Sequence, residues 1–200
     1  MQKSRLEAFS DGVFAIVITL LILDIRFPEV GYSQFAATLT SLLPRILMYM
    51  LSFVIIGLYW VSHHNSMQVV QKIDRDFLWI NILFLLCVSF IPFPTSLVGR
   101  YPFEALPIII YGITLIVCNL IGTAMMFYML YHPHLAVRGF GMRYARRHIP
   151  IHIGINLSYL AAILLAHSFP LISYLIYVAV VIGLVFFLPK MNDGINYQGK

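Results

Sequence analysis

Long apolar stretches, separated by short polar segments, dominate the pattern along this chain. A helix that crosses a bilayer needs about 20 mostly apolar residues. Six stretches approach that length, at about 9–27, 38–64, 77–97, 106–131, 149–167 and 170–188. The pattern predicts an all-α integral membrane protein in which residues 1–200 form a single domain of six transmembrane helices.

Prolines bound these stretches and predict one kink. The first stretch stops before Pro28, because proline cannot continue a helix. Pro44 falls in the first turns of the second stretch, and Pro189 follows the sixth. Pro92 and Pro94 lie near the end of the third stretch and predict a kink or break there.

The composition supports a membrane protein. Hydrophobic residues make up 60% of the chain and charged residues only 10%, whereas a soluble domain carries about 25% charged residues. Cys87 and Cys118 each lie inside an apolar run, so we interpret them as small core residues. We expect the lipid bilayer as a partner and no nucleic acid, because basic loops explain the net charge of +5.

Loop charge predicts the orientation. With the N-terminus inside, ten of the 13 basic residues fall on cytoplasmic segments. These are Lys3, Arg5, Lys72, Arg75, Arg138, Arg143, Arg146, Arg147, Lys190 and Lys200, against Arg26, Arg45 and Arg100 outside. We expect a multi-pass protein of the cell membrane with both termini cytoplasmic. The bias explains the basic loop 132–148, and anionic lipid binding there is a minor alternative.

The first stretch combines a polar beginning with an apolar remainder. Arg5, Glu7, Ser10 and Asp11 precede an apolar run that extends to Leu23. Glu7 and Asp11 also argue against a signal peptide. Charged groups near the hydrocarbon are costly and mark a path, a relay or a structural lock. We therefore expect this helix to carry the function.

A helical projection separates two faces of this segment. Ile16, Thr19, Leu20 and Leu23 fall on one face together with Gly12. Asp11 lies about 140° from Ile16, and Ser10 about 120° away on the other side. One face is therefore apolar with a single hydroxyl, while the polar groups point elsewhere.

Partners for those polar groups end the second stretch. An antiparallel second helix brings Trp60 and the adjacent His63 and His64 to the depth of Ser10 and Asp11, where they can satisfy a carboxylate and a hydroxyl. The two histidines point in different directions, so we expect only one to join. The predicted structural polar network contains Arg5, Phe9, Ser10, Asp11, Trp60, His63, His64 and Asn65.

Neither metal binding nor enzyme chemistry is indicated. The histidine pairs considered as metal ligands are His63 with His64, His132 with His134, and His148 with His152. Interfacial histidines commonly hydrogen-bond instead, and we predict no metal site. No nucleophile–base pair, HExxH motif or phosphate-binding glycine loop is present, so we expect no enzyme.

Two sequence motifs of this chain resemble those of a known family. Arg5-x3-Phe9-Ser10-Asp11, followed by an apolar helix with Thr19, resembles the first-span signature of the transmembrane protein 175 family of lysosomal and prokaryotic potassium channels. Trp60-x2-His63-His64 is similar to the family's second-span pattern. The resemblance covers the chain in topology, but its specific motifs cover only 5–23 and 60–65.

The resemblance implies a homotetramer in which four first helices line a central pore. The positions that match the family's apolar constriction are Ile16, Leu20 and Leu23, with Thr19 beside them. It implies conduction of K⁺, and of other monovalent cations, without a cofactor. No Thr-Val-Gly-Tyr-Gly carbonyl filter occurs; a ring of Ile and Leu closes a pore by dewetting. Independently, we expect Asp24, about 80° from Ile16, to attract cations at the outer mouth.

Two other classes of function stay open. A small ion- or proton-coupled transporter is the main alternative, although no acidic residue lies near the middle of a predicted span, where coupling sites occur. A purely structural membrane subunit would leave the cluster of Arg5, Ser10 and Asp11 with no role beyond packing. On either view, Ile16, Leu20 and Leu23 would face lipid or neighbouring helices.

Overall fold

Each named element of the described chain is a helix, which confirms the predicted all-α class. The computed structural model describes residues 2–137 and 140–192. The elements are α1 (Lys3–Leu20), η1 (Leu21–Asp24), η2 (Tyr32–Gln34), α2 (Phe35–Ser41), α3 (Leu43–Val69), α4 (Arg75–Phe90), α5 (Pro92–Arg100), α6 (Ala105–Tyr131), η3 (Pro133–Leu135), α7 (Met142–Leu165) and α8 (Pro170–Asn192).

Five helical stretches are long and apolar enough to cross a membrane. In the described residues these are Lys3–Asp24, Leu43–Val69, Arg75–Arg100, Ala105–Tyr131 and Ala145–Leu165. A shorter apolar helix covers Pro170–Phe186, within α8. The molecule is therefore an all-helical, multi-pass membrane protein with five to six apolar helices.

The second stretch begins and ends later than its apolar residues suggest. The helix breaks at Leu42, and α3 restarts with Pro44 in its first turn, where the missing N–H of proline costs little. At the other end α3 continues through polar Asn65, Ser66 and Gln68 to Val69. His63 therefore lies inside a continuous helix.

The third stretch breaks at Ile91, immediately before Pro92. Thr95 Oγ1 donates a hydrogen bond to the carbonyl oxygen of Ile91 at 2.8 Å. Buried Ser52 of α3 lies 2.8 Å from Thr95 Oγ1 and 2.9 Å from the Tyr111 hydroxyl of α6. The Val88 carbonyl, which loses its N–H partner at Pro92, instead accepts a hydrogen bond from the Ile91 amide at 3.1 Å, so this backbone group is satisfied, as a membrane helix requires.

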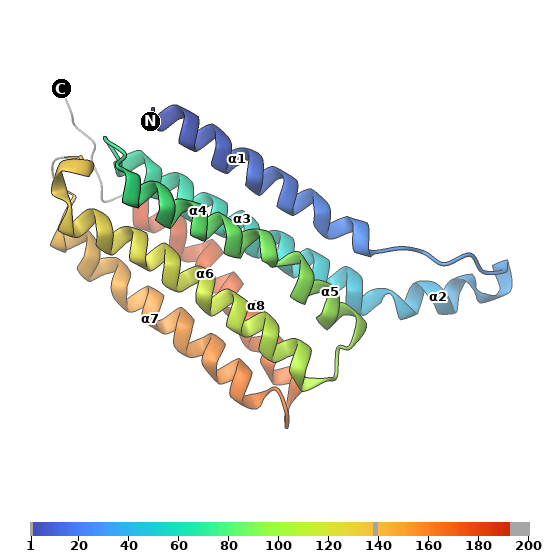
Figure 1. The fold of residues 1–200 in the computed structure, drawn as a ribbon. Helices are drawn as coiled ribbons and strands as arrows, with labels where there is room; N and C mark the ends of the chain where they lie inside the picture. The colour runs from blue at the N-terminus through green and yellow to red at the C-terminus, as the bar shows by residue number, and fades with distance from the viewer. Residues whose placement is uncertain (1, 138–139, 193–200) are drawn as a thin grey trace.

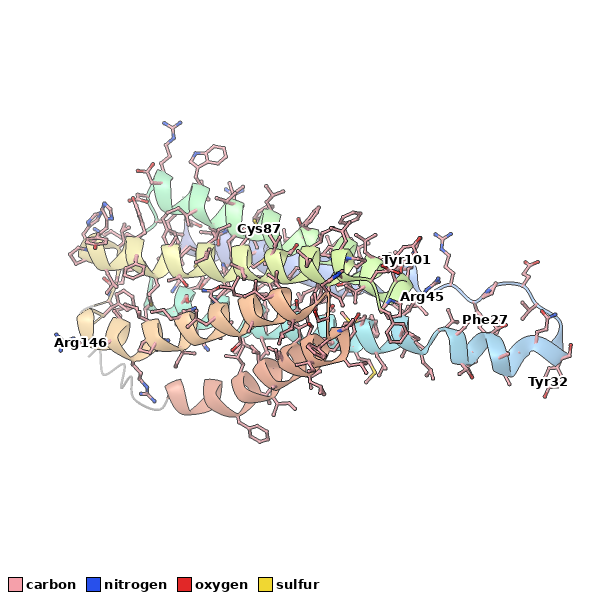
Figure 2. All side chains as sticks on the ribbon, turned by 90° about the horizontal axis from the view of Figure 1, so that it is seen from below. Phe27, Tyr32, Arg45, Cys87, Tyr101 and Arg146 are labelled. Carbon is pink, nitrogen blue, oxygen red and sulfur yellow. The ribbon has the colours of Figure 1, made fainter. Side chains whose placement is uncertain are left out.

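Helix α1 lies at one edge of the bundle, against α3 and α4, while α6, α7 and α8 form the other side (Figure 1). Leu6, Phe14 and Val17 of α1 are buried against this bundle. The ring centroid of Phe14 lies 5.6 Å from that of His63 and 6.3 Å from that of Phe84. The segment between α1 and α3, with α2, extends beyond the bundle, and Figure 2 shows Phe27 and Tyr32 on this arm.

Basic side chains mark one end of the bundle. We call it the basic end, and it carries Lys3, Arg5, Lys72, Arg75, Arg146 and Arg147. Figure 2 shows Arg146 at this end and Arg45 and Tyr101 toward the opposite end. Arg138 and Lys200, also used to predict orientation, lie outside the described residues, as do the side chains of Arg143 and Lys190.

Candidate functional site

Helix α1 has one anchored face and one uncovered face. Leu6, Ser10, Phe14, Val17 and Leu21 are at most 3% exposed and recur every three or four residues, as on one side of an α-helix. On the other side, Ile16, Leu20 and Leu23 are 60%, 46% and 62% exposed. We call this second surface the open face, and it comprises Gly12, Ile16, Thr19, Leu20 and Leu23.

The side chains of the open face align along the helix axis where α1 continues into the 3₁₀ helix η1. A 3₁₀ helix has about three residues per turn, so side chains three apart eclipse one another. Leu20 and Leu23 consequently lie in one line along the helix. The Thr19 hydroxyl is shared between the carbonyls of Ala15, at 3.0 Å, and Ile16, at 2.8 Å. Such back-bonding bends helices, and the tightening begins two residues later.

A buried chain of hydrogen bonds joins α1 to α4 and α3. The amide nitrogen of Asn81 donates to Ser10 Oγ at 3.2 Å. The Asn81 amide oxygen therefore faces His63 Nε2, 2.7 Å away, and His63 donates this bond. Ser10 and Asn81 are fully buried and His63 is 5% exposed.

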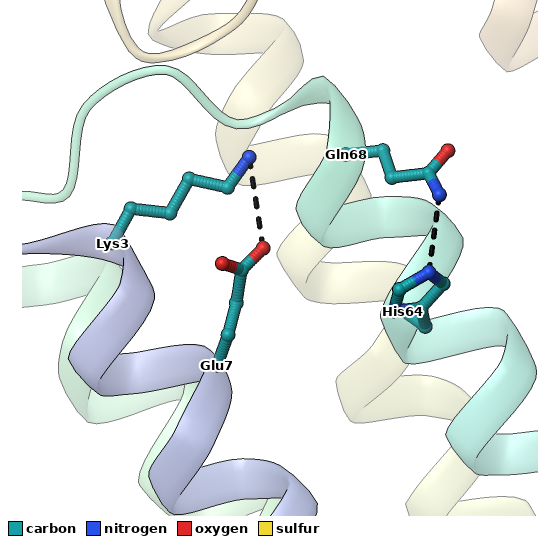
Figure 3. A network of polar contacts seen from close by, with 4 residues as sticks. All are labelled: Lys3, Glu7, His64 and Gln68. Atoms are coloured by element: carbon teal, nitrogen blue, oxygen red, sulfur yellow. Dashed lines mark hydrogen bonds and ion pairs between the residues drawn. The ribbon is translucent and has the colours of Figure 1, made fainter.

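A second, separate contact joins α1 to α3 on the outside of the bundle. Trp60 Nε1 donates to Asp11 Oδ1 at 2.8 Å. The Trp60 and His64 rings stack with centroids 5.6 Å apart, and Gln68 Nε2 lies 3.1 Å from His64 Nε2 (Figure 3). Figure 3 also shows Lys3 and Glu7 facing each other across one turn of α1, at 3.6 Å.

The structure thus places the predicted network residues in two branches. His63 points inward to Asn81, and His64 points outward to Trp60. Asn65 lines an internal cavity, and Phe9 is 55% exposed. Among the described residues, no ion pair joins Arg5 to Asp11. Sequence reasoning missed Asn81, whose only signal was a lone amide within an apolar run.

Asp24, expected at the outer mouth, is paired with a cation. Arg100 of α5 reaches Asp24 Oδ1 at 2.6 Å. The pair lies half-exposed at the end opposite the basic end and ties η1 to α5. The Arg100 guanidinium therefore offsets the negative charge that the sequence alone suggests for Asp24.

The histidines considered as metal ligands make other contacts. Within the described ranges, no three His, Cys, Asp or Glu side chains come together as a metal site. His152 Nδ1 lies 2.7 Å from the Asn119 amide oxygen. The ring of His132 stacks on Tyr128, with centroids 4.2 Å apart, and lies 5.9 Å from that of His134.

These features define a class of membrane protein: a helical bundle that holds its first helix by polar contacts on one side and presents an apolar stripe on the other. A family model described as the endosomal/lysosomal potassium channel TMEM175 matches residues 5–92, which include both faces and the Trp60–His64 segment. The chain belongs to the TMEM175 family.

Similar proteins extend this assignment. A potassium channel of Chryseobacterium sp. (strain P1-3) is 45% identical over 116 residues, which cover 58% of this chain and 59% of that protein. A potassium channel of Chamaesiphon minutus is 44% identical over 50% of this chain and 51% of that protein. The mouse endosomal/lysosomal proton channel TMEM175 is 30% identical over 96% of this chain and 39% of that protein.

Solved structures share the fold. The crystal structure of a lysosomal potassium-selective channel TMEM175 homologue from Chamaesiphon minutus has a TM-score of 0.80 and 28% identity, and the alignment covers 95% of this chain and 98% of that one. The matched stretches span about half the length of the bacterial relatives, between 49% and 59%. The family is one of ion channels, not enzymes.

Proposed function

We propose that this protein is a potassium-selective or potassium-preferring cation channel in which the open face of α1 lines a central pore. One observation carries the proposal: this face is apolar and uncovered, while the opposite face of α1 is anchored by buried hydrogen bonds. A helix that is rigidly held on one side can present its other side to an ion path. The names of the bacterial relatives support potassium as the ion.

A single α1 cannot enclose a path, so the proposal requires several copies of the chain. We infer a homotetramer in which four copies of Ile16, Leu20 and Leu23 form an apolar neck, with Thr19 beside it. Such a neck closes by dewetting. Because it offers no ligands to replace lost water, it favours potassium, which is more weakly hydrated than sodium.

Positive charge orients the proposed channel. The basic end carries most of the basic side chains that the structure describes, and in this proposal it faces the cytoplasm, as the positive-inside rule requires. The arm and the Asp24–Arg100 pair then lie on the outer side of the cell membrane. This orientation places Ser10, Asp11 and Trp60 in the inner half of the bilayer and the apolar neck beyond them.

Recording from the purified protein in planar bilayers tests the proposal. We expect unitary current steps whose reversal potential moves toward the potassium equilibrium potential in a potassium–sodium gradient. A transporter turns over too slowly to give such steps. Macroscopic flux without unitary steps would contradict the channel and support the ion- or proton-coupled transporter.

A further inference from the structure

An internal cavity lies between α3, α6, α7 and α8, toward the basic end. Its volume is about 100 Å³. The apolar wall includes Ile55, Leu58, Phe84, Met125, Met126 and Ile155. The polar wall includes Ser62, His63, Asn65, Ser66, Asn119, His148 and His152. Water occupies about 30 Å³ per molecule in the liquid and enters cavities that offer several polar partners, so this cavity suits a few water molecules.

His63 connects this cavity to α1. Its Nε2–H donates a hydrogen bond to the Asn81 amide oxygen, and the Asn81 amide nitrogen in turn donates to Ser10 of α1. The remaining ring nitrogen, Nδ1, is therefore the atom that takes up a proton. The ring stacks parallel to Phe84, with centroids 5.8 Å apart and planes 3° apart, and an aromatic face favours a cation.

Charged and titratable groups reach His63 from several helices. Glu7 and Asp11 of α1 and His64 of α3 act on His63 directly. Tyr59, Cys118, His148, His152 and Tyr159 line the same cavity, and Arg147 lies near His148. The described parts of α4 and α8 contribute only uncharged groups to the cavity. Burial and the neighbouring His64 disfavour a charged His63, whereas the Asn81 hydrogen bond and the carboxylates of Asp11 and Glu7 favour it.

We propose that this cavity is a cytoplasmic proton-binding site, and that a proton on His63 tightens the hydrogen-bond chain that holds α1. A charged donor makes a hydrogen bond roughly twice as strong as a neutral one, and bonds in a chain polarise one another. Acid on the cytoplasmic side thus holds the first helix more firmly. The effect on ion current rests on the proposed function; proton binding itself does not.

Fluorescence of Trp60 tests proton binding without any current, because Trp60 contacts α1 through Asp11. Of the two tryptophans, Trp79 is removed by Trp79→Phe. His64 is replaced by Gln, because a protonated imidazole stacked on Trp60 would itself quench the emission. In this background we expect an acid transition in Trp60 emission with a midpoint below about 6.5, the ordinary histidine value, because burial disfavours the charged ring.

Two variants act on the proposed site in different ways. His63→Gln keeps a donor for Asn81 but cannot titrate, and we expect the transition to disappear. Gly122→Val fills the cavity; a Cβ at Gly122 would lie 3.6 Å from Phe84, an ordinary contact. Loss of water disfavours an ionised group, so the midpoint should move down by about one pH unit. Gly154→Val is the matched control, because nothing lies within 4 Å of a Cβ there.

The outcomes separate the two proposals. A transition that persists in His63→Gln, or a midpoint that does not move in Gly122→Val, overturns the proton site whatever the current does. If His63→Gln does not assemble, the Gly122→Val comparison decides alone. A transition that depends on His63 in a protein without unitary currents supports the proton site and contradicts the channel.

Discussion

At the residue scale, the most informative position is Ile16 on the open face of α1. Ile16→Asn places an amide in the proposed neck, where it hydrates the constriction and offers ligands to sodium. We expect the permeability ratio of potassium over sodium to fall by about tenfold, equivalent to about 1.4 kcal/mol in relative barrier. Reversal potentials in planar bilayers measure this ratio.

Ile22→Asn is the matched control, because Ile22 is 46% exposed but lies off the open face. The same chemical change there should leave the ratio near its original value. Equal changes of the permeability ratio in Ile16→Asn and Ile22→Asn would contradict the assignment of the open face to the pore.

A second prediction at this scale concerns Asn81, the amide between Ser10 and His63. Asn81→Ala leaves both partners buried without their hydrogen bonds, and each such group costs about 1–3 kcal/mol. We expect a lower midpoint of thermal unfolding in detergent. Asn156→Ala is the control, because the Asn156 amide oxygen is already buried without a partner among the described residues. Similar losses at both positions would count against a special role for Asn81.

Single residues were only partly predictable. Ser10, Asp11, Trp60 and His63 could be grouped from sequence, since a carboxylate and a hydroxyl near the hydrocarbon must find donors. Which of these side chains bond to one another could not be predicted from the sequence. Asn81 lies 71 positions after Ser10, and no local pattern indicates that its amide turns toward α1.

At the scale of elements, the Asp24–Arg100 pair joins η1 to α5. If Asp24 also attracts cations, Asp24→Asn should lower the unitary current at low ionic strength, and Arg100→Gln should raise it. Both differences should vanish near 1 M salt, where the Debye length is about 3 Å. Unitary currents across a salt series provide the measurement. A difference that is independent of salt would point to a structural effect of the pair instead.

Asp74 caps α4 and ties it to α6 at the basic end. Burial alone would raise the pKa of Asp74, but hydrogen bonds from the Phe77 amide and the Tyr128 hydroxyl, each 2.8 Å long, together with nearby His132, hold it below its usual 3.8. A carboxyl with a lowered pKa stabilises the fold fully above its unfolded value, and this contribution disappears as pH falls through the folded value.

Asp74→Ala should therefore lower the unfolding midpoint at neutral pH. The difference from the original protein should shrink as the pH falls below about 3.8. Thermal unfolding at several pH values provides the measurement. Asp76→Ala, in the same first turn, is the control, and an equal, pH-independent loss in both variants would contradict the role of the cap.

Helix breaks were easier to predict than helix ends. Pro92 interrupts the third stretch in the structure, because its ring and missing N–H act within one turn. The end of α3 was not evident, because Asn65, Ser66 and Gln68 are polar yet remain helical up to Val69. A limit drawn from hydropathy marks where the apolar surface ends rather than where the helix does.

At the scale of the whole molecule, Asp11 is expected to act on assembly. Its bond to Trp60 fixes α1 against α3, and in the proposed tetramer four such helices present the same face to one another. We predict that Asp11→Ala shifts the protein from the proposed tetramer toward smaller species and changes selectivity less. Size-exclusion chromatography with light scattering measures the mass. Glu7→Ala, which removes only the contact with Lys3, is the control; an intact Asp11→Ala tetramer with altered selectivity would reverse this assignment.

The sequence by itself determined the class of fold and the two faces of α1. Apolar stretches of span length leave a chain few alternatives in a bilayer, since every backbone group must be bonded within a helix. The angle between residues of one helix is likewise a local property, so Ile16 and Ser10 had to point apart.

Only the tertiary structure decided which polar groups meet and where space remains. The chain from Ser10 through Asn81 to His63 joins three helices, and the cavity beside His63 is lined by side chains of α3, α4, α6, α7 and α8. Asp24 likewise accepts a hydrogen bond from Arg100, which lies 76 positions later in the chain. Such contacts depend on how helices rotate and approach one another, which side-chain packing sets over the whole bundle and not within any one segment.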